Sequence, residues 1–186
     1  MVLIGLLAKK QHGKDTTADH LVKNYNFEKI AYATPLKNVC KELFDFNEEQ
    51  LYGDEKEKID DFWGITPRGA FQYVGTELVR KQMGVLLPEV GDAFWVKVME
   101  RKLMNDNNLD KNIVISDVRF QNEVDLIKKC GGIIIKIERN LENQDNHLSE
   151  MEIDNIKNYD HKINNNSGIL ELYDNIDNII KLYKMC

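Results

Sequence analysis

The sequence predicts an α/β fold with three layers, α/β/α, in which helices cover both faces of a central parallel sheet of about five strands. Short apolar runs typical of buried strands alternate along the chain with segments of helical periodicity. Parallel neighbours need a crossover connection, which is usually a helix, so the alternation indicates βαβ units. In such sheets, ligands bind at the carboxyl edge of the strands.

The N-terminal segment reads as strand, loop and helix. Residues 2–7 are apolar and end in a polar loop, after which Ala18 and Leu21 begin an amphipathic helical pattern. A second strand is predicted over residues 29–32. The helix that follows has Pro35 in its first turn, a position that tolerates proline.

The middle of the chain lacks strand signals. Residues 45–66 are acidic and without clear periodicity, so we expect an exposed loop or flap there. Pro67 is suited to open another helix, and a further helix runs through Trp95 and Met99. These segments predict a small helical region beside the sheet.

Strand signals return in the C-terminal part. Residues 113–115 form a buried strand that leads into a helix over 121–129, and a Gly-Gly pair precedes a strand over 133–137. The stretch 140–146 is polar. An amphipathic helix over 169–183 closes the chain.

The composition excludes several classes of protein. The 186 residues are enough for one domain, and the hydrophobic share of 42% argues against disorder. With 25 Lys and Arg against 31 Asp and Glu, the net charge of −6 disfavours binding to nucleic acid. No apolar run is long enough for a membrane span, and the N-terminus lacks the charge order of a secretory signal. Three widely spaced cysteines (Cys40, Cys130 and Cys186) fit reduced thiols, so we expect a cytoplasmic protein.

Residues 8–17 (AKKQHGKDTT) are close to the phosphate-binding loop pattern G-x-x-x-x-G-K-[ST]. They depart from it at Ala8, where the pattern has glycine, and at Asp15, where it has a hydroxyl. The position between the first strand and the first helix supports the motif, because a helix N-terminus presents unpaired N–H groups and a partial positive charge. We expect ATP to be bound here by Lys10, Gln11, Gly13, Lys14, Asp15, Thr16 and Thr17.

Within this loop the residue types suggest separate roles. Lys14 is expected to reach the β- and γ-phosphates, and Thr16 a phosphate oxygen. Asp15 occupies the position of the usual magnesium-binding hydroxyl and would act on the metal through water, so Asp15 and Thr16 are the predicted metal residues. The alternative is a surface loop in which Asp15 or Thr16 caps the helix.

The string Gly13 to Asp19 (GKDTTAD) resembles the phosphate loop of the deoxynucleoside monophosphate kinases of phages and large DNA viruses. Further motifs resemble that family in the family's order: Thr66-Pro67-Arg68 with Gln72, Gly75-Thr76-Glu77 and Arg80; Ile115 to Phe120 with Asn122-Glu123; and His147 to Glu150. The resemblance spans about residues 2–170. It implies one P-loop NTPase domain of the nucleoside monophosphate kinase type over 1–186, with an acceptor-binding helical insertion at 45–107 and a lid-like segment at 139–152.

The resemblance also implies which residues contact the acceptor nucleotide: Leu36, Lys37, Arg68, Gly75, Thr76, Trp95, Asp117, Arg119 and Glu123. Arg68 is the best supported, because a monophosphate suits a planar, bidentate cation. Asp117 follows a buried strand and would orient magnesium-bound water or the acceptor, or else cap the next helix. An i,i+4 ion pair on one helical face competes with ligand contact for Arg119 and Glu123.

Two further residues carry open alternatives. Trp95 is expected in the core from its helical spacing, and a base-stacking role rests on the resemblance alone. Arg139 leaves the fourth strand where kinases of this type carry cationic side chains over the transferring phosphoryl group. The predicted catalytic set is therefore Lys14, Arg68, Asp117 and Arg139. His12, His20 and His161 show no recognisable partners, and His147 with Glu150 is too small a set for a metal site.

These observations predict an enzyme that uses ATP and Mg²⁺ to phosphorylate a deoxynucleoside monophosphate and so supplies DNA precursors. The partners are small molecules, with no nucleic acid and no membrane, and homodimerisation stays open. Two alternatives remain: a kinase of another small phosphorylated acceptor, such as phosphomevalonate, and a non-catalytic P-loop NTP-binding switch. A cationic acceptor region favours the kinase, because a switch needs no second phosphate site.

Overall fold

A computed structural model describes residues 2–105, 111–141 and 148–184. The chain divides into two compact units, Met1–Ala31 with Glu100–Cys186, and Tyr32–Met99. Each unit has its own buried core. None of the described helices is long and apolar enough to cross a membrane.

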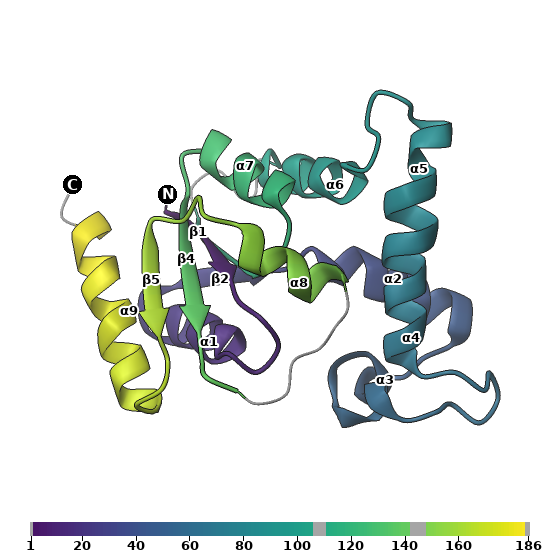
Figure 1. Ribbon diagram of the computed structural model, residues 1–186, viewed down its shortest axis with the longest axis horizontal. Helices are drawn as coiled ribbons and strands as arrows, with labels where there is room; N and C mark the ends of the chain where they lie inside the picture. The colour runs from purple at the N-terminus through teal and green to yellow at the C-terminus, as the bar shows by residue number, and fades with distance from the viewer. Residues whose placement is uncertain (1, 106–110, 142–147, 185–186) are drawn as a thin grey trace. The chain divides into compact units, whose positions relative to one another are not determined.

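The first unit is built on a parallel sheet (Figure 1). Its strands are β1 (Leu3–Leu7), β2 (Phe27–Ile30), β3 (Asn112–Val118), β4 (Ile133–Glu138) and β5 (His161–Asn164). They lie in the order β2-β3-β1-β4-β5, and every neighbouring pair is parallel. The predicted five-stranded parallel sheet is confirmed. Its central strand, β1, has β3 on one side and β4 on the other, so the loop after β1 emerges where the strand order reverses.

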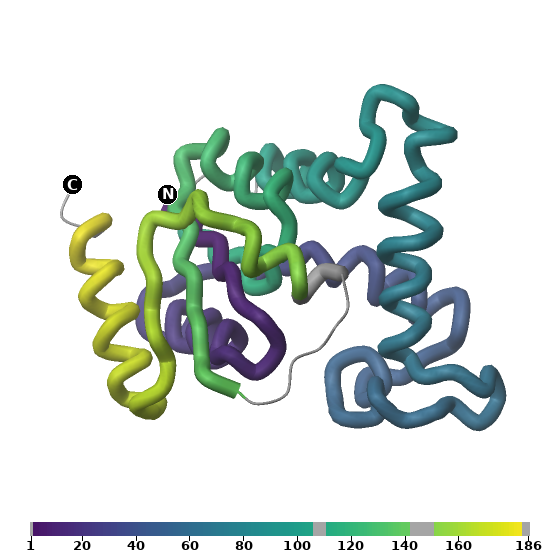
Figure 2. The backbone as a smooth tube through the Cα atoms, viewed as in Figure 1, coloured from purple at the N-terminus to yellow at the C-terminus, as the bar shows by residue number. Residues whose placement is uncertain are grey.

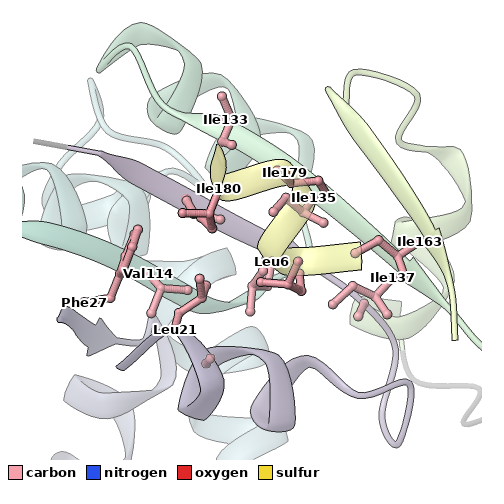
Figure 3. Packing of buried hydrophobic residues seen from close by; sticks show 14 of the residues in the cluster. Leu6, Leu21, Phe27, Val114, Ile133, Ile135, Ile137, Ile163, Ile179 and Ile180 are labelled. Atoms are coloured by element: carbon pink, nitrogen blue, oxygen red, sulfur yellow. The ribbon is translucent and has the colours of Figure 1, made fainter. Parts of the chain in front are cut away.

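Helices α1 (Lys14–Tyr25) and α9 (Ile169–Lys184) cover one face of this sheet. Figure 3 shows the packing, in which alternate residues of the strands meet apolar side chains of both helices. The fully buried members of this core include Leu6, Leu21 and Ile135. Truncating one such side chain to alanine costs about 2 to 5 kcal/mol in the free energy of unfolding. The packing of this layer therefore stabilises the strand and the helix that the loop after β1 connects.

Helix α7 (Gln121–Lys129) covers the opposite face. Gly5 of β1 points toward it, and a Cβ added at Gly5 would lie 2.6 Å from Cδ1 of Ile127. Helix α8 (Leu148–Asn155) is joined to the sheet through the buried Lys136, whose Nζ donates to the carbonyl oxygens of Ile153 and Ile156 at 3.3 and 3.5 Å. Helices therefore flank both faces, as the predicted three layers require.

The second unit is helical. It contains α2 (Ala33–Phe44), α3 (Glu48–Tyr52), the 3₁₀ helix η1 (Asp54–Glu57), α4 (Pro67–Gln72), the π-helix η2 (Tyr73–Arg80), α5 (Lys81–Leu86) and the start of α6 (Phe94–Leu103). Its core is formed by Cys40, Phe46, Leu51, Ala70, Phe71 and Val74, against which Leu36 packs. The unit starts before the 45–107 insertion predicted from the sequence, because α2 contributes to this core.

Several element predictions were wrong in detail. Residues 45–66 are not simply an exposed loop, because they form α3 and η1, and the side chains of Phe46 and Leu51 are buried. Asn47 caps α3, with its side chain and that of Gln50 each accepting a backbone N–H of the other residue. The second strand covers Phe27–Ile30 and not 29–32, because residue 32 is already the cap of α2.

Candidate functional site

The loop of residues 8–13 joins β1 to α1, as Figure 2 shows in the purple part of the tube. Gln11 and Gly13 both have positive φ angles, 65° and 105°. The φ angle of 105° favours glycine at position 13, and a Cβ added there would lie 2.5 Å from Nδ2 of Asn165, so that side chain would have to shift. The loop thus turns tightly and delivers Lys14 as the first residue of α1.

A pocket of about 350 Å³ opens beside this loop. Its walls come from the phosphate loop with the first turn of α1, from the residue after β4, and from the connection after β5 with the first turn of α9. The lining residues are Gln11, Gly13, Lys14, Asp15, Thr16, Arg139, Asn165, Gly168, Ile169 and Leu172. All these segments lie at the carboxyl edge of the sheet, where the fold predicts a ligand.

Most of the predicted ATP residues take part in this pocket. Gln11, Gly13, Lys14, Asp15 and Thr16 line it together with Arg139, whereas Lys10 is not in the lining. Thr17 is fully buried behind the loop, and its Oγ1 has no hydrogen-bond partner among the described residues. A buried hydroxyl without a protein partner is usually hydrogen-bonded to water or to a ligand.

The pocket combines positive charge with oxygen ligands. The side chain of Lys14 is 12% exposed, and its Nζ lies 3.8 Å from Oδ2 of Asp15. Oδ1 of Asp15 lies 3.4 Å from Nζ of Lys29, which also pairs with Asp19 at 2.9 Å. A carboxylate and a hydroxyl at positions 15 and 16 fit the hard ligands that Mg²⁺ prefers. The described residues contain no cluster of three or more His, Cys, Asp or Glu that could hold a metal ion.

His12 and Asn165, which were not among the predicted site residues, connect the walls of the pocket. The backbone N–H of Arg139 donates to Nδ1 of His12 at 3.1 Å, and Nδ2 of Asn165 donates to the carbonyl oxygen of His12 at 3.0 Å. The backbone N–H of Asn165 donates to the carbonyl oxygen of Glu138 at 2.7 Å. The clue to Asn165 was its position directly after a strand, but β5 itself was not located from the sequence.

Asp117, Arg119 and Glu123 lie at or after the end of β3. Asp117 was expected to follow a strand over 113–115, but it lies within β3, which extends to Val118, three residues beyond that prediction. Arg119 and Glu123 were expected to lie on one face of the same helix. This was wrong, because α7 begins at Gln121 and Arg119 precedes it. The carboxylate of Glu123 accepts the backbone N–H groups of Arg119 and Phe120 at 2.8 and 3.2 Å, which caps α7.

Arg68 lies in the first turn of α4. Thr66 caps this helix by accepting the backbone N–H of Gly69 at 3.0 Å, and Pro67 is its first residue, as predicted. Arg68 donates through Nε and Nη2 to Oε1 of Glu57, at 3.2 and 3.0 Å. The guanidinium of Arg68 is therefore paired with a carboxylate of the same unit.

Among the remaining predicted acceptor residues of the second unit, Gly75 and Thr76 belong to η2, and Leu36 and Trp95 contact Gly75. The indole N–H of Trp95 donates to the carbonyl oxygen of Gly75 at 2.9 Å, and Trp95 is 8% exposed. A Cβ at Gly75 would lie 2.7 Å from Cδ2 of Leu36, and Thr76 is also buried. π-helical turns are often found at functional sites. Separately, Nζ of Lys37 lies 4.0 Å from the ring centroid of Tyr52.

The other histidines have structural partners. Nε2 of His20 lies 2.6 Å from Oδ1 of Asp177, and Nε2 of His161 lies 2.8 Å from the hydroxyl of Tyr183. His147 and the side chains up to Glu150 lie outside the described residues. The lid-like segment 139–152 is therefore described only at its two ends.

Solved structures with a similar fold include a shikimate kinase from Aquifex aeolicus. It aligns with a TM-score of 0.56 at 15% identity and covers 97% of this chain and 96% of that structure. A Thermus thermophilus protein, TT1252, aligns with a TM-score of 0.50, also at 15% identity, over 99% of this chain and 96% of its own. These likenesses show that the chain shares the overall fold of these structures.

Sequence comparison identifies the family. Residues 54–176 match the family model described as deoxynucleotide monophosphate kinase. The chain is 44% identical to a deoxynucleotide monophosphate kinase homologue of Acanthamoeba polyphaga mimivirus, over 95% of this chain and 94% of the relative. It is 28% identical to the deoxynucleoside-5'-monophosphate kinase of Escherichia phage T5, over 86% of this chain and 60% of the phage protein. The family predicted from the motifs is confirmed, and the chain belongs to the deoxynucleotide monophosphate kinase family.

Proposed function

We propose that this protein transfers the γ-phosphoryl group of ATP to a deoxynucleoside monophosphate and releases ADP and the deoxynucleoside diphosphate. The observation that carries the proposal is the pocket at the carboxyl edge of the sheet, where Lys14 and Arg139 lie beside the phosphate loop of a chain from this family. Neither a phosphomevalonate-like kinase nor a non-catalytic switch is favoured by the family to which the chain belongs.

In this proposal the loop holds the donor. Backbone N–H groups of the loop and of the first turn of α1 bind the phosphates of ATP, and Lys14 neutralises the charge that develops on the transferring group. Arg139 contributes a second cation from the other wall of the same pocket. Gln11, Gly13, Asp15 and Thr16 complete the donor contacts; Lys10 and Thr17 remain predicted contacts that lie outside the lining.

Magnesium would be held by Asp15 and Thr16. A bound Mg²⁺ would neutralise phosphate charge and orient the polyphosphate. Mg²⁺ keeps several waters and binds largely through substrate phosphates, so one or two protein oxygen ligands would be sufficient to hold it.

The acceptor is proposed to contact the residues that the family resemblance implies. Arg68 binds its phosphate, and Leu36, Lys37, Gly75, Thr76 and Trp95 belong with Arg68 to the second unit. Asp117, Arg119 and Glu123 are the remaining contacts that the resemblance implies. Glu123 then acts by shaping the start of α7, since its carboxylate accepts two backbone N–H groups there.

The chemistry needs no covalent intermediate with the protein. An oxygen of the acceptor phosphate forms the new bond to the γ-phosphorus as the bond to the bridging oxygen of ADP breaks. The acceptor oxygen is already a nucleophile at neutral pH, so alignment and charge neutralisation supply the catalysis. We assign the catalytic roles to Lys14, Arg68, Asp117 and Arg139.

The test is a coupled assay of ADP release with ATP and Mg²⁺, run against every deoxy- and ribonucleoside monophosphate. We expect turnover with at least one deoxynucleoside monophosphate and none without an acceptor. ATP hydrolysis that ignored every acceptor would contradict the kinase proposal.

A cytoplasmic location is a further proposal, supported by the free thiols of Cys40 and Cys130.

A further inference from the structure

We propose that His12 is a positioning residue that holds Arg139 at the donor pocket through the acceptor nitrogen of a neutral imidazole. The inference rests on the proposed function, in which Arg139 contacts the transferring phosphoryl group. His12 belongs to the phosphate loop but does not itself line the pocket.

The hydrogen bond between Arg139 and His12 indicates which nitrogen of the His12 ring carries the proton. The backbone N–H of Arg139 lies 3.1 Å from Nδ1 of His12. A backbone N–H can only donate, so Nδ1 has to carry a lone pair, and the proton of the neutral ring is on Nε2. Protonation of Nδ1 would place two donors against each other and break this contact.

The backbone of His12 forms the other half of the connection. Its carbonyl oxygen accepts from Nδ2 of Asn165 at 3.0 Å, and the backbone N–H of Asn165 is bonded to the carbonyl oxygen of Glu138 at 2.7 Å. His12 therefore joins the phosphate loop to the residues that directly follow β4 and β5. Both Arg139 and Asn165 line the pocket, so the ring fixes where the chain leaves β4 and where the Arg139 side chain starts.

A matched pair of variants isolates the acceptor nitrogen. In His12→Asn, the amide Oδ1 is attached to Cγ as Nδ1 is in histidine, so the acceptor is kept. His12→Leu has nearly the same shape as asparagine but no acceptor. We expect His12→Leu to lower kcat/KM for ATP about 3- to 10-fold, the effect of losing one hydrogen bond, and His12→Asn to keep most of the wild-type value.

A double-mutant cycle with Arg139→Ala tests whether His12 acts through Arg139. Because the proposed role of His12 is to place that side chain, His12→Leu is expected to cause no further loss beyond about twofold in the Arg139→Ala background. Losses that multiply in the double variant, or equal losses in His12→Asn and His12→Leu, would overturn the proposal. Thermal melting of each variant separates these effects from general destabilisation.

Two measurements keep the inference distinct from the proposed function. Long-range proton–nitrogen NMR spectra of the wild-type protein report which ring nitrogen carries the proton, and we expect an unprotonated Nδ1 on His12 at neutral pH. Titration with ATP and Mg²⁺ gives the donor affinity without any acceptor. If no monophosphate is phosphorylated, the proposed function fails, whereas a protonated Nδ1, or ATP affinity equal in wild type and His12→Leu, defeats the role of His12.

Discussion

In the proposed mechanism, Lys14 is the residue whose charge follows the migrating phosphoryl group. It lines the pocket as the first residue of α1, and its side chain is only 12% exposed. We expect Lys14→Met to lower kcat by several orders of magnitude, because preorganised cations act on charge that develops in the transition state. Steady-state kinetics and circular dichroism check the loss and the fold.

A matched control is available on the same helix. Lys23 is exposed in the last turn of α1, and Lys23→Met is expected to leave both activity and stability near the wild-type values. Near-normal turnover by a folded Lys14→Met protein would remove the phosphate loop from the proposed mechanism.

Asp15 is one of the two residues, with Ala8, at which this loop departs from the usual phosphate-loop pattern. It lines the pocket between Lys14 and Lys29, where an exposed carboxylate can reach a hydrated cation. We expect Asp15→Ala to raise the Mg²⁺ concentration needed for half-maximal activity more than it raises KM for ATP. Asp19→Ala is the control, because Asp19 also pairs with Lys29 but does not line the pocket. An unchanged Mg²⁺ titration would assign Asp15 to the helix N-terminus instead.

Arg68 is expected to act on the acceptor and not on the donor. Arg68→Ala removes the guanidinium that Glu57 now engages, and we expect a higher KM for the monophosphate, a lower kcat and an almost unchanged KM for ATP. The expected loss of transition-state binding is about 2 to 4 kcal/mol, the scale for truncating one partner of a desolvated charge pair. Arg68→Lys rescues only part of it, because an ammonium lacks the planar fork. Equal effects on both substrates would place the acceptor phosphate elsewhere.

At the scale of elements, η2 depends on a hydrogen bond from another helix. The carbonyl oxygen of Gly75 within this π-helix accepts the indole N–H of Trp95, which is on α6. Trp95→Phe keeps an aromatic ring but removes the donor, leaving a buried carbonyl short of a partner. We expect a loss of about 1 to 3 kcal/mol in the free energy of unfolding, measured with urea.

The control for this variant is Tyr73→Phe, because Tyr73 is 59% exposed at the start of the same π-helix. It is expected to unfold at the wild-type urea concentration. If Trp95→Phe is as stable as Tyr73→Phe, the indole bond does not support η2, and the resemblance to family members is left as the sole argument for a role of Trp95.

The elements differ in how well the sequence predicted them, for physical reasons. Helix α7 agrees residue for residue, because Val124 and Ile127 form a clear buried stripe between polar ends. β5 was not located, because only Ile163 of its four residues is buried and the pattern lacks an apolar run. In α2, Val39 and Leu43 are exposed, and Cys40 is the buried residue of the helix.

At the scale of the whole molecule, the order of motifs was sufficient to predict the family and the sheet edge that carries the site. The phosphate loop and Arg139 each follow a strand, and Asp117 lies near the end of β3, so parallel strands bring these residues to one edge. The far wall of the pocket was not predictable in the same way. Asn165 and Ile169 reach it only through long-range pairing of β5 with β4, which local periodicity does not encode.

The pairing of β5 with β4 also makes the stability of the protein depend on pH. Asp160 directly precedes β5, and its carboxylate accepts the backbone N–H of Ile134 at 2.6 Å and the ammonium of Lys128. Burial by itself raises the pKa of Asp160, but the hydrogen bonds from Lys128 and Ile134 outweigh it, so the pKa lies below its usual 3.8. The folded state therefore favours the charged carboxylate.

The sign of the effect follows from linkage. Because the unfolded chain binds this proton more readily, the stabilisation is present above the usual pKa and is lost as the pH falls through the folded value. We expect the free energy of unfolding to decrease from about pH 5 to pH 3, and Asp160→Asn to be less stable at pH 7 and to show a shallower decrease. Asp174→Asn, on an exposed position of α9, is the control. Urea titrations across this range measure both variants, and an acid limb as steep in Asp160→Asn as in the wild type would show that other carboxylates set the acid sensitivity of the sheet.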